Sequence, residues 1–337
     1  MSAVSWLQLV TSSGYQVEAA ARAQSVLESA GPQAGRIETL SWFAFAVATA
    51  VYLATMAALF WALWRARRRA HAGTPLAAGA ERGMTRGVAW ATGATVVILL
   101  VFLSYDLSVG RALTPSPTKN PLTIQLVGHQ WWWEVVYPDS APQRRVTTAN
   151  ELHVPVGEPV VVILESRDVI HSVWIPQLGG KKDLIPGHKQ SFWFQADTAG
   201  VYRGQCAEFC GHQHAKMALV VIAEPRVAFE RWLSQSRSPA AAPSDSVTRR
   251  GEEVFLSAPC VMCHAIEGTP AGSRAGPDLT HLATRLTIGA GTLPNTRGNL
   301  AGWIVDPQRI KPGVHMPPNA LSPSDLDALL TYLQGLK

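Results

Sequence analysis

Two long apolar runs dominate the first third of the chain. Residues 39–64 form 26 consecutive positions without a charge, and residues 87–105 form 19. A helix needs about 20 residues to cross the hydrocarbon core of a bilayer, which is about 30 Å thick. Buried helices of globular proteins rarely run this long without a charged residue. The pattern therefore predicts two transmembrane helices.

The segment between these runs is strongly basic. Six arginines and one glutamate lie within residues 65–86. Because arginine and lysine accumulate in cytoplasmic loops, we expect a helix hairpin over residues 38–110 with loop 65–86 in the cytoplasm. Residues 1–37 are then an extracytoplasmic N-terminal segment, and the chain after the hairpin is extracytoplasmic as well.

After the hairpin, the apolar runs along the chain are shorter. Runs of β-branched and aromatic residues at 160–164, 190–194 and 218–222 are bounded by Gly, Pro and Asp. Short strands separated by turn residues predict a β-sandwich or barrel, which we assign to residues 120–235. A stretch rich in Ser, Pro and Ala at 236–246 predicts a linker.

Helical periodicity returns in the last part of the chain, at residues 246–256 and 322–336. Ser322 precedes Asp325 by three positions, as expected at the start of a helix. Residues 247–337 are therefore predicted to form a small all-α domain.

The net charge of +5 changes this picture little, because residues 65–86 account for all of it. The rest of the chain is neutral. A basic nucleic-acid-binding face on a folded domain is therefore excluded as the source of the high isoelectric point.

The first of two cysteine pairs lies in a loop that reads Cys206, Cys210, His214 and Met217, at steps of four, four and three. Thiolate, imidazole and thioether ligands suit copper. A mononuclear blue-copper site uses one cysteine, whereas two thiolates can bridge two copper ions. His171 follows a β-rich run and is the candidate second imidazole. A zinc site of two cysteines and two histidines, or an oxidised pair, is the alternative.

The second pair lies in Cys260-Val-Met-Cys263-His264. Two thiols and an adjacent imidazole at this spacing are the signature of c-type haem attachment. A redox dithiol or half of a zinc site is the alternative. If both pairs bind cofactors, the chain has no cysteine left for a disulfide.

Residues 39–230 resemble subunit II of the haem-copper cytochrome c oxidases. The resemblance rests on the hairpin, the segment 128–134 (Gly-His-Gln-Trp-Trp-Trp-Glu), the His171 segment and the loop 206–217. It implies a cupredoxin-like β-sandwich that holds a dinuclear CuA centre. The implied copper ligands are His171, Cys206, Glu208 through its backbone carbonyl, Cys210, His214 and Met217.

The same resemblance implies two further roles. The Glu208 side chain matches the residue that reaches a magnesium ion at the boundary with subunit I. Trp131 matches the exposed tryptophan through which electrons arrive from cytochrome c. The chain departs from the family at Gly87, where many members carry a glutamate at the mouth of a proton path, and Glu81 is the nearest acid.

Residues 247–337 resemble a class I cytochrome c in the order of their segments. The resemblance implies haem c bound covalently to Cys260 and Cys263, with His264 and Met316 as axial ligands. Such a pair of ligands raises the haem potential. The carbonyl of Pro277 is expected against the Nδ1 proton of His264. His315 is the rival of Met316 as the second ligand.

Together these resemblances imply the electron-transfer subunit of a caa3-type oxidase, in which a tethered cytochrome c domain supplies electrons to CuA and subunit I reduces oxygen to water with proton pumping. The implied partners are subunits I and III, cytochrome c or a quinol-cytochrome c reductase as donor, and membrane lipid, but no nucleic acid. The implied location is the bacterial inner membrane, with both domains periplasmic. The alternative is a CuA-containing electron-transfer or metal-handling membrane protein outside the oxidases.

Overall fold

The computed structural model describes residues 24–72, 80–113 and 121–337. The chain divides into two compact units, of which one is Gly35–Pro115 and the other combines Met1–Ala34 with Ser116–Lys337. The first unit is a helix hairpin. The second contains a two-sheet β domain and a helical domain.

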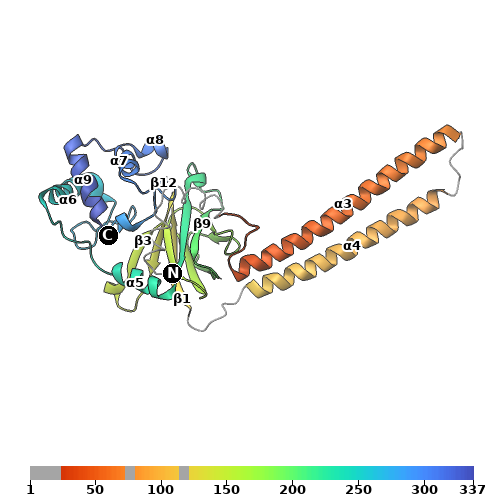
Figure 1. Ribbon diagram of the computed structural model, residues 1–337, viewed down its shortest axis with the longest axis horizontal. Helices are drawn as coiled ribbons and strands as arrows, with labels where there is room; N and C mark the ends of the chain where they lie inside the picture. The colour runs from red at the N-terminus through yellow and green to blue at the C-terminus, as the bar shows by residue number, and fades with distance from the viewer. Residues whose placement is uncertain (1–23, 73–79, 114–120) are drawn as a thin grey trace. The chain divides into compact units, whose positions relative to one another are not determined.

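The hairpin consists of α3 (Pro32–Ala72) and α4 (Ala80–Leu113), which lie side by side in Figure 1. The ring of Phe43 contacts those of Phe102 and Tyr105, with centroids 6.3 and 5.8 Å apart. Both helices are long and apolar enough to cross a membrane, and none of either apolar window is buried within the protein. This agrees with the two predicted spans.

Both helices extend beyond the predicted apolar runs. Most of the predicted loop 65–86 is helical, because alanine and arginine are strong helix formers. The guanidinium of Arg68 lies 3.8 Å from the centroid of the Trp64 ring one turn earlier. The connecting residues 73–79, the side chain of Glu81 and most of the N-terminal segment lie outside the described residues.

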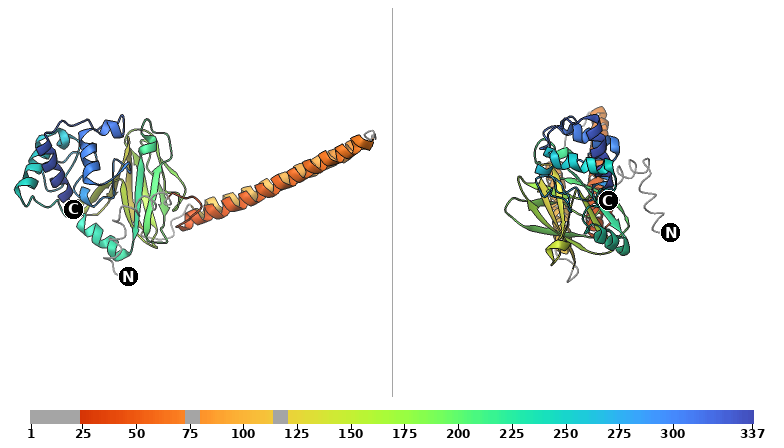
Figure 2. Two further views of the ribbon diagram at one scale, coloured as in Figure 1. Left: turned by 45° about the horizontal axis from the view of Figure 1, so that its top comes forward. Right: turned by 90° about the vertical axis from the view of Figure 1, so that its left-hand side faces the viewer.

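Two five-stranded sheets form the β domain, in the orders β3-β2-β1-β5-β8 and β4-β10-β9-β6-β7. The pairs β1/β5 and β4/β10 are parallel, and the other pairs are antiparallel. The sheets are layered one over the other, as Figure 2 shows. The strands are β1 (Leu122–His129), β2 (Trp132–Tyr137), β3 (Val146–Ala149), β4 (Glu151–Pro155), β5 (Val160–Ser166), β6 (His171–Trp174), β7 (Lys182–Leu184), β8 (Gln190–Phe194), β9 (Gly200–Cys206) and β10 (Ala218–Glu224).

Alternating apolar side chains from both sheets meet in one core. Ile124 and Val162 from the first sheet and Leu152 and Leu219 from the second are at most 1% exposed and belong to the same cluster. This alternation explains why the short runs at 160–164, 190–194 and 218–222 form strands. Helix α5 (Arg226–Gln235), which the pattern did not predict, closes one end of the domain through the buried Phe229.

The helical domain is built around α6 (Ser246–Ser257) and α9 (Pro323–Gly335), close to the predicted ranges. Asp245 caps α6, and Ser322 caps α9 by accepting a hydrogen bond from the amide of Asp325 at 3.1 Å. The two helices pack closely at Gly251, where an added Cβ would lie 2.2 Å from the carbonyl oxygen of Ala328. The remaining elements are the short helices α7 (Arg297–Val305) and α8 (Pro307–Ile310), the 3-10 turns η1 (Pro142–Arg144), η2 (His214–Lys216), η3 (Pro259–Met262) and η4 (Leu282–Thr284), and the hairpin β11 (Thr287–Ile288) and β12 (Leu293–Pro294).

Candidate metal centres

The first cysteine pair lies in a buried cluster of soft donors. The sulfur atoms of Cys206 and Cys210 are 3.7 Å apart. The Nδ1 atom of His171 lies 3.9 Å from the first sulfur, and the Nδ1 atom of His214 lies 3.6 Å from the second. The Met217 sulfur is 3.9 Å from that of Cys210. Two adjacent sulfurs, each with its own imidazole, suit a site for two bridged metal ions.

Two strands and one loop bring these donors together. Cys206 is the last residue of β9, His171 is the first residue of β6, and the two strands pair at Val173 and Cys206. The carbonyl of Glu208 lies 3.2 Å from the Cys206 sulfur, whereas its side chain is exposed. The residues that spacing and resemblance indicate for copper are therefore adjacent in the structure.

A residue that sequence reasoning missed orients the first imidazole. The Oδ1 atom of Asp168 lies 2.8 Å from Nε2 of His171. The same carboxylate accepts the amide of Gln130 at 2.7 Å. By engaging Nε2, Asp168 leaves Nδ1 of His171 facing the sulfurs, as partners of metal-binding histidines commonly do.

The acidity of the thiols also fits metal binding. A hydrogen bond from Cys210 lowers the pKa of Cys206 to about 3, and the same bond raises the pKa of Cys210. Two thiolates this close repel each other, so a cation is needed before both can be deprotonated. The donor chemistry therefore fits copper.

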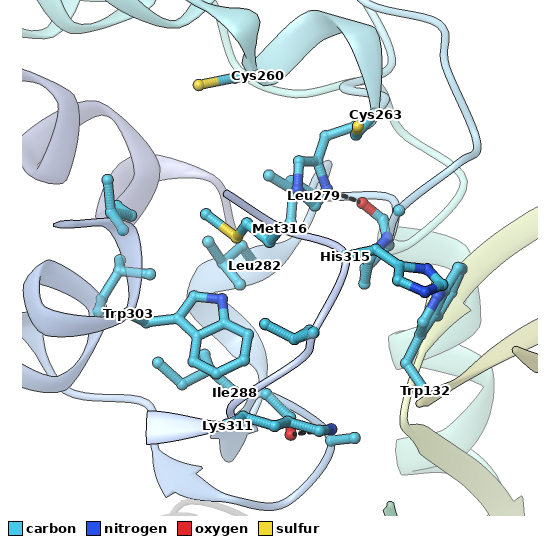
Figure 3. Close-up of a pocket in the computed structure, with 18 of the residues that line it drawn as sticks. Trp132, Cys260, Cys263, Leu279, Leu282, Ile288, Trp303, Lys311, His315 and Met316 are labelled. Carbon is cyan, nitrogen blue, oxygen red and sulfur yellow. Dashed lines mark hydrogen bonds between the residues drawn. The ribbon is translucent and has the colours of Figure 1, made fainter. Parts of the chain in front are cut away.

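The second cysteine pair lines a pocket of the helical domain (Figure 3). Cys260, Cys263 and His264 form part of its wall. The Nδ1 atom of His264 lies 2.7 Å from the carbonyl oxygen of Pro277, which confirms the expected contact. Burial lowers the pKa of His264, which favours the neutral imidazole that metals bind. This wall fits a covalently attached haem.

Met316 and His315 occupy different places at this pocket. Figure 3 shows the Met316 sulfur directed into the pocket, while the His315 ring points away from it. The ring of His315 has its centroid 5.8 Å from that of Trp131. The geometry therefore favours Met316 over its rival as the residue facing His264.

Apolar side chains form most of the pocket, and two basic residues join them. Arg285 is 9% exposed, and its Nε atom has no hydrogen-bond partner among the described residues. Lys311 is 1% exposed, and burial lowers its pKa to about 7. Haem is an apolar ring with two carboxylates, so this lining suits it. Sequence reasoning missed both residues, because isolated basic residues in loops are usually exposed.

Trp131 connects the two centres. Its Nε1 atom donates a hydrogen bond to the carbonyl of Cys210 at 2.9 Å, and it also lines the pocket of the helical domain. Only 6% of its surface is exposed. This differs from the exposed tryptophan that the resemblance implied, because the loop before Met316 covers it.

Comparisons with known proteins match both domains. The family model described as Cytochrome C oxidase subunit II, periplasmic domain matches residues 139–224, and the one described as Cytochrome c matches residues 248–337. Cytochrome c oxidase subunit 2 of Alkalihalophilus pseudofirmus is 38% identical over 248 residues, which cover 72% of this chain and 70% of the relative. The protein of the same name from Bacillus sp. strain PS3 is 37% identical over 232 residues, covering 65% of this chain and 63% of the relative.

One similar solved structure is the periplasmic domain of subunit II of cytochrome oxidase from Bradyrhizobium japonicum, which is 31% identical. The match covers 36% of this chain and 97% of the solved one, with a TM-score of 0.34. The identity and coverage of the Alkalihalophilus relative, together with matches to both domains, decide the family. The chain belongs to the cytochrome c oxidase subunit II family and carries a cytochrome c domain after its two-sheet β domain.

Proposed function

We propose that this chain is subunit II of a caa3-type cytochrome c oxidase. In this role it accepts electrons at a covalently bound haem c, carries them to a dinuclear CuA centre and delivers them to subunit I, which reduces oxygen to water and pumps protons. The observation that carries the proposal is the position of Trp131, which hydrogen-bonds to the Cys210 carbonyl and lines the pocket beside Cys260 and Cys263.

When bound, haem c and the copper pair supply one-electron redox chemistry. Cys206, Cys210 and the imidazoles of His171 and His214 would hold the two copper ions. The buried thioether of Met217 and the carbonyl of Glu208 supply weak ligands. The proposed set for CuA is His171, Cys206, Glu208, Cys210, His214 and Met217.

In the helical domain, Cys260 and Cys263 would hold the haem covalently, and His264 and Met316 would bind its iron. The Pro277 carbonyl holds the His264 ring in place through Nδ1, so that Nε2 is free for iron. The apolar walls exclude water, which favours the neutral reduced form of the iron centre. Trp131 is the proposed residue through which electrons reach the copper site.

We propose that the hairpin 38–110 anchors the chain in the bacterial inner membrane, with the copper domain 120–235, the linker 236–246 and the cytochrome c domain 247–337 on the periplasmic side. Glu208 is the proposed ligand for magnesium at the boundary with subunit I. Subunit III completes the complex, and cytochrome c or a quinol-cytochrome c reductase is the donor.

Purification of the complex through a tag on this chain tests the proposal. We expect a large haem-bearing subunit to copurify, and each copy of this chain to bind two copper ions and one haem c in addition to the metal groups of that subunit. Electron paramagnetic resonance should show a delocalised mixed-valence copper signal beside a low-spin c-type haem. Cys210→Ser should abolish the copper signal and keep the haem. A stable, lone chain with a single copper or a zinc ion would contradict the proposal.

A further inference from the structure

The two loops that carry metal ligands contact each other directly. The side chain of Gln213 donates a hydrogen bond to the carbonyl of Pro312, and that of Lys216 donates to the carbonyl of Ile310. Both donors lie in residues 206–217, which we call the copper loop. One acceptor is the last residue of α8, and the other lies in the segment between α8 and Met316. The cytochrome c domain therefore sits on the copper domain at this place.

Lys311 is the most deeply buried polar group of this contact. Its side chain is 1% exposed, and its Nζ atom donates to the backbone carbonyls of Trp131 at 2.7 Å and Gly289 at 3.1 Å. One acceptor belongs to the copper domain and the other to the cytochrome c domain. The amide of Lys311 donates to the carbonyl of Pro307 at 2.8 Å, which holds its backbone against α8.

A second buried contact joins the same two domains. Glu151, at the start of β4, is 2% exposed and accepts the amides of Leu286 and Thr287 at 2.7 and 3.2 Å. Nearby, the amide of Ala218 donates to the carbonyl of Ala290 at 3.0 Å. Two buried polar groups, one from each domain, thus fix a single docked arrangement, because displacement of either domain leaves them without partners.

From these contacts we infer that Lys311 is a positioning residue that holds the cytochrome c domain over Trp131, so that the copper centre is closed to soluble electron donors and reserved for the chain's own haem domain. The inference rests on the proposed function and adds which electron donors can reach the copper centre. The 6% exposure of Trp131 supports it, since a docking protein cannot reach a ring that is already covered.

The linker 236–246 helps to keep the cytochrome c domain docked over Trp131. A domain joined by a short linker meets its docking site at a millimolar effective concentration, so a few good hydrogen bonds suffice to keep it bound. Removing the Lys311 amine leaves the two carbonyls without their donor. We call a molecule open when its cytochrome c domain is not docked over Trp131. We expect the fraction of open molecules to increase by about tenfold or more, because one well-buried hydrogen bond to an amine is lost.

Hydroxyl-radical footprinting of the purified oxidase complex measures the closure directly. Oxidation of Trp131 is compared by mass spectrometry with that of Trp232, a half-buried tryptophan on α5. Lys311→Met should raise Trp131 oxidation about tenfold or more, and so should Glu151→Ala from the other domain. Lys181→Met, at an exposed lysine of the copper domain, is the matched control and should leave the oxidation of Trp131 unchanged.

Rapid mixing with a reduced soluble cytochrome c tests the consequence for electron donors. In the unchanged complex, haem c should be reduced before CuA, whereas in Lys311→Met part of the CuA should be reduced without waiting for haem c. The inference is overturned if Trp131 stays protected in both Lys311→Met and Glu151→Ala while their haem and copper spectra remain intact. Missing copper or haem signals in the unchanged complex would instead contradict the proposed function.

Discussion

At the residue scale, the donors of the proposed copper site are oriented by neighbours outside the proposed ligand set. Gly128 is required beside His171, because an added Cβ would lie 2.7 Å from the Cδ2 atom of the imidazole. Asp168 holds the same ring through a hydrogen bond at Nε2. The position of one ligand therefore depends on at least two residues outside the copper loop.

Replacing Asp168 tests this dependence. Asp168→Ala should lower copper affinity about 10- to 100-fold, the usual cost of losing the partner of a ligating histidine. Copper content after dialysis against a graded series of chelator concentrations measures it. Asp197→Ala, at an exposed carboxylate of the same domain, is the control. Equal copper retention in the two variants would show that Asp168 does not orient His171.

Met316 can be tested separately from haem attachment. Met316→Leu should keep the haem bound through its thioethers but lower its midpoint potential, because a thioether ligand stabilises the reduced iron. A redox titration followed by haem absorbance gives the potential. Met262→Leu, at a side chain that is 73% exposed, should leave it unchanged. An unchanged potential in Met316→Leu would exclude Met316 as the axial ligand.

At the element scale, the cytochrome c domain depends on the close crossing of α6 and α9. The crossing is possible because residue 251 is a glycine, whose place beside Ala328 and Tyr332 leaves no room for a side chain. Phe255 and Tyr332 continue the contact with ring centroids 6.4 Å apart. The helix pair forms one wall of the haem pocket through Phe255 and Leu329.

Gly251→Ala should therefore destabilise this domain by about 3 kcal/mol, the upper end of the cost of overpacking. Gly298→Ala is the matched control, since Gly298 lies in α7 with open space around its Cα. There the added methyl should stabilise by about 0.5–1 kcal/mol, because alanine loses less backbone entropy in a helix. Thermal unfolding followed by haem absorbance compares the two variants. Equal melting temperatures would contradict the claim that the close crossing of α6 and α9 requires a glycine at position 251.

The same two helices are joined by an exposed ion pair, in which Arg250 lies 2.8 Å from Asp325. The hydrogen bond from Arg250, and then that from Ser322, lower the pKa of Asp325 below its ordinary value of 3.8. A carboxyl with a lowered pKa stabilises the fold at a pH above its unfolded value and loses that effect as the pH falls through its folded value. The melting temperature of Asp325→Asn should thus lie below that of the unchanged protein near neutral pH and approach it in acid. A pH-independent difference would contradict this role.

At the scale of the whole molecule, we expect the charge on the hairpin to determine its orientation in the membrane. Six arginines lie within residues 65–86, at the end of α3 and the start of α4. We expect alkaline phosphatase fused after Lys337 to be active and the same enzyme fused after Arg69 to be inactive, because it folds only outside the cytoplasm. Green fluorescent protein at the same two positions should give the opposite result. Phosphatase activity at both positions would contradict the hairpin.

Much of the architecture could be predicted because its signals are local. The lengths of the two apolar runs depend on bilayer thickness alone. The strands at 160–164, 190–194 and 218–222 and the two long helices of the cytochrome c domain follow from periodicity and caps. Helix α5 and the extension of α3 and α4 through the arginines were missed, because propensity beyond an apolar run gives no sharp boundary.

What the sequence by itself determined is the set of donors that are neighbours along the chain. Cys206, Cys210, His214 and Met217 fall within one loop, and Cys260, Cys263 and His264 within one pentapeptide, so spacing alone brings them within reach of one cofactor. Only the tertiary structure decided which distant groups join them. Strand pairing brings His171 and Asp168 to the copper loop, and domain packing buries Trp131 beneath Lys311, 180 positions away in the chain. Burial and contact between residues so far apart depend on how whole elements pack, and no local pattern encodes them.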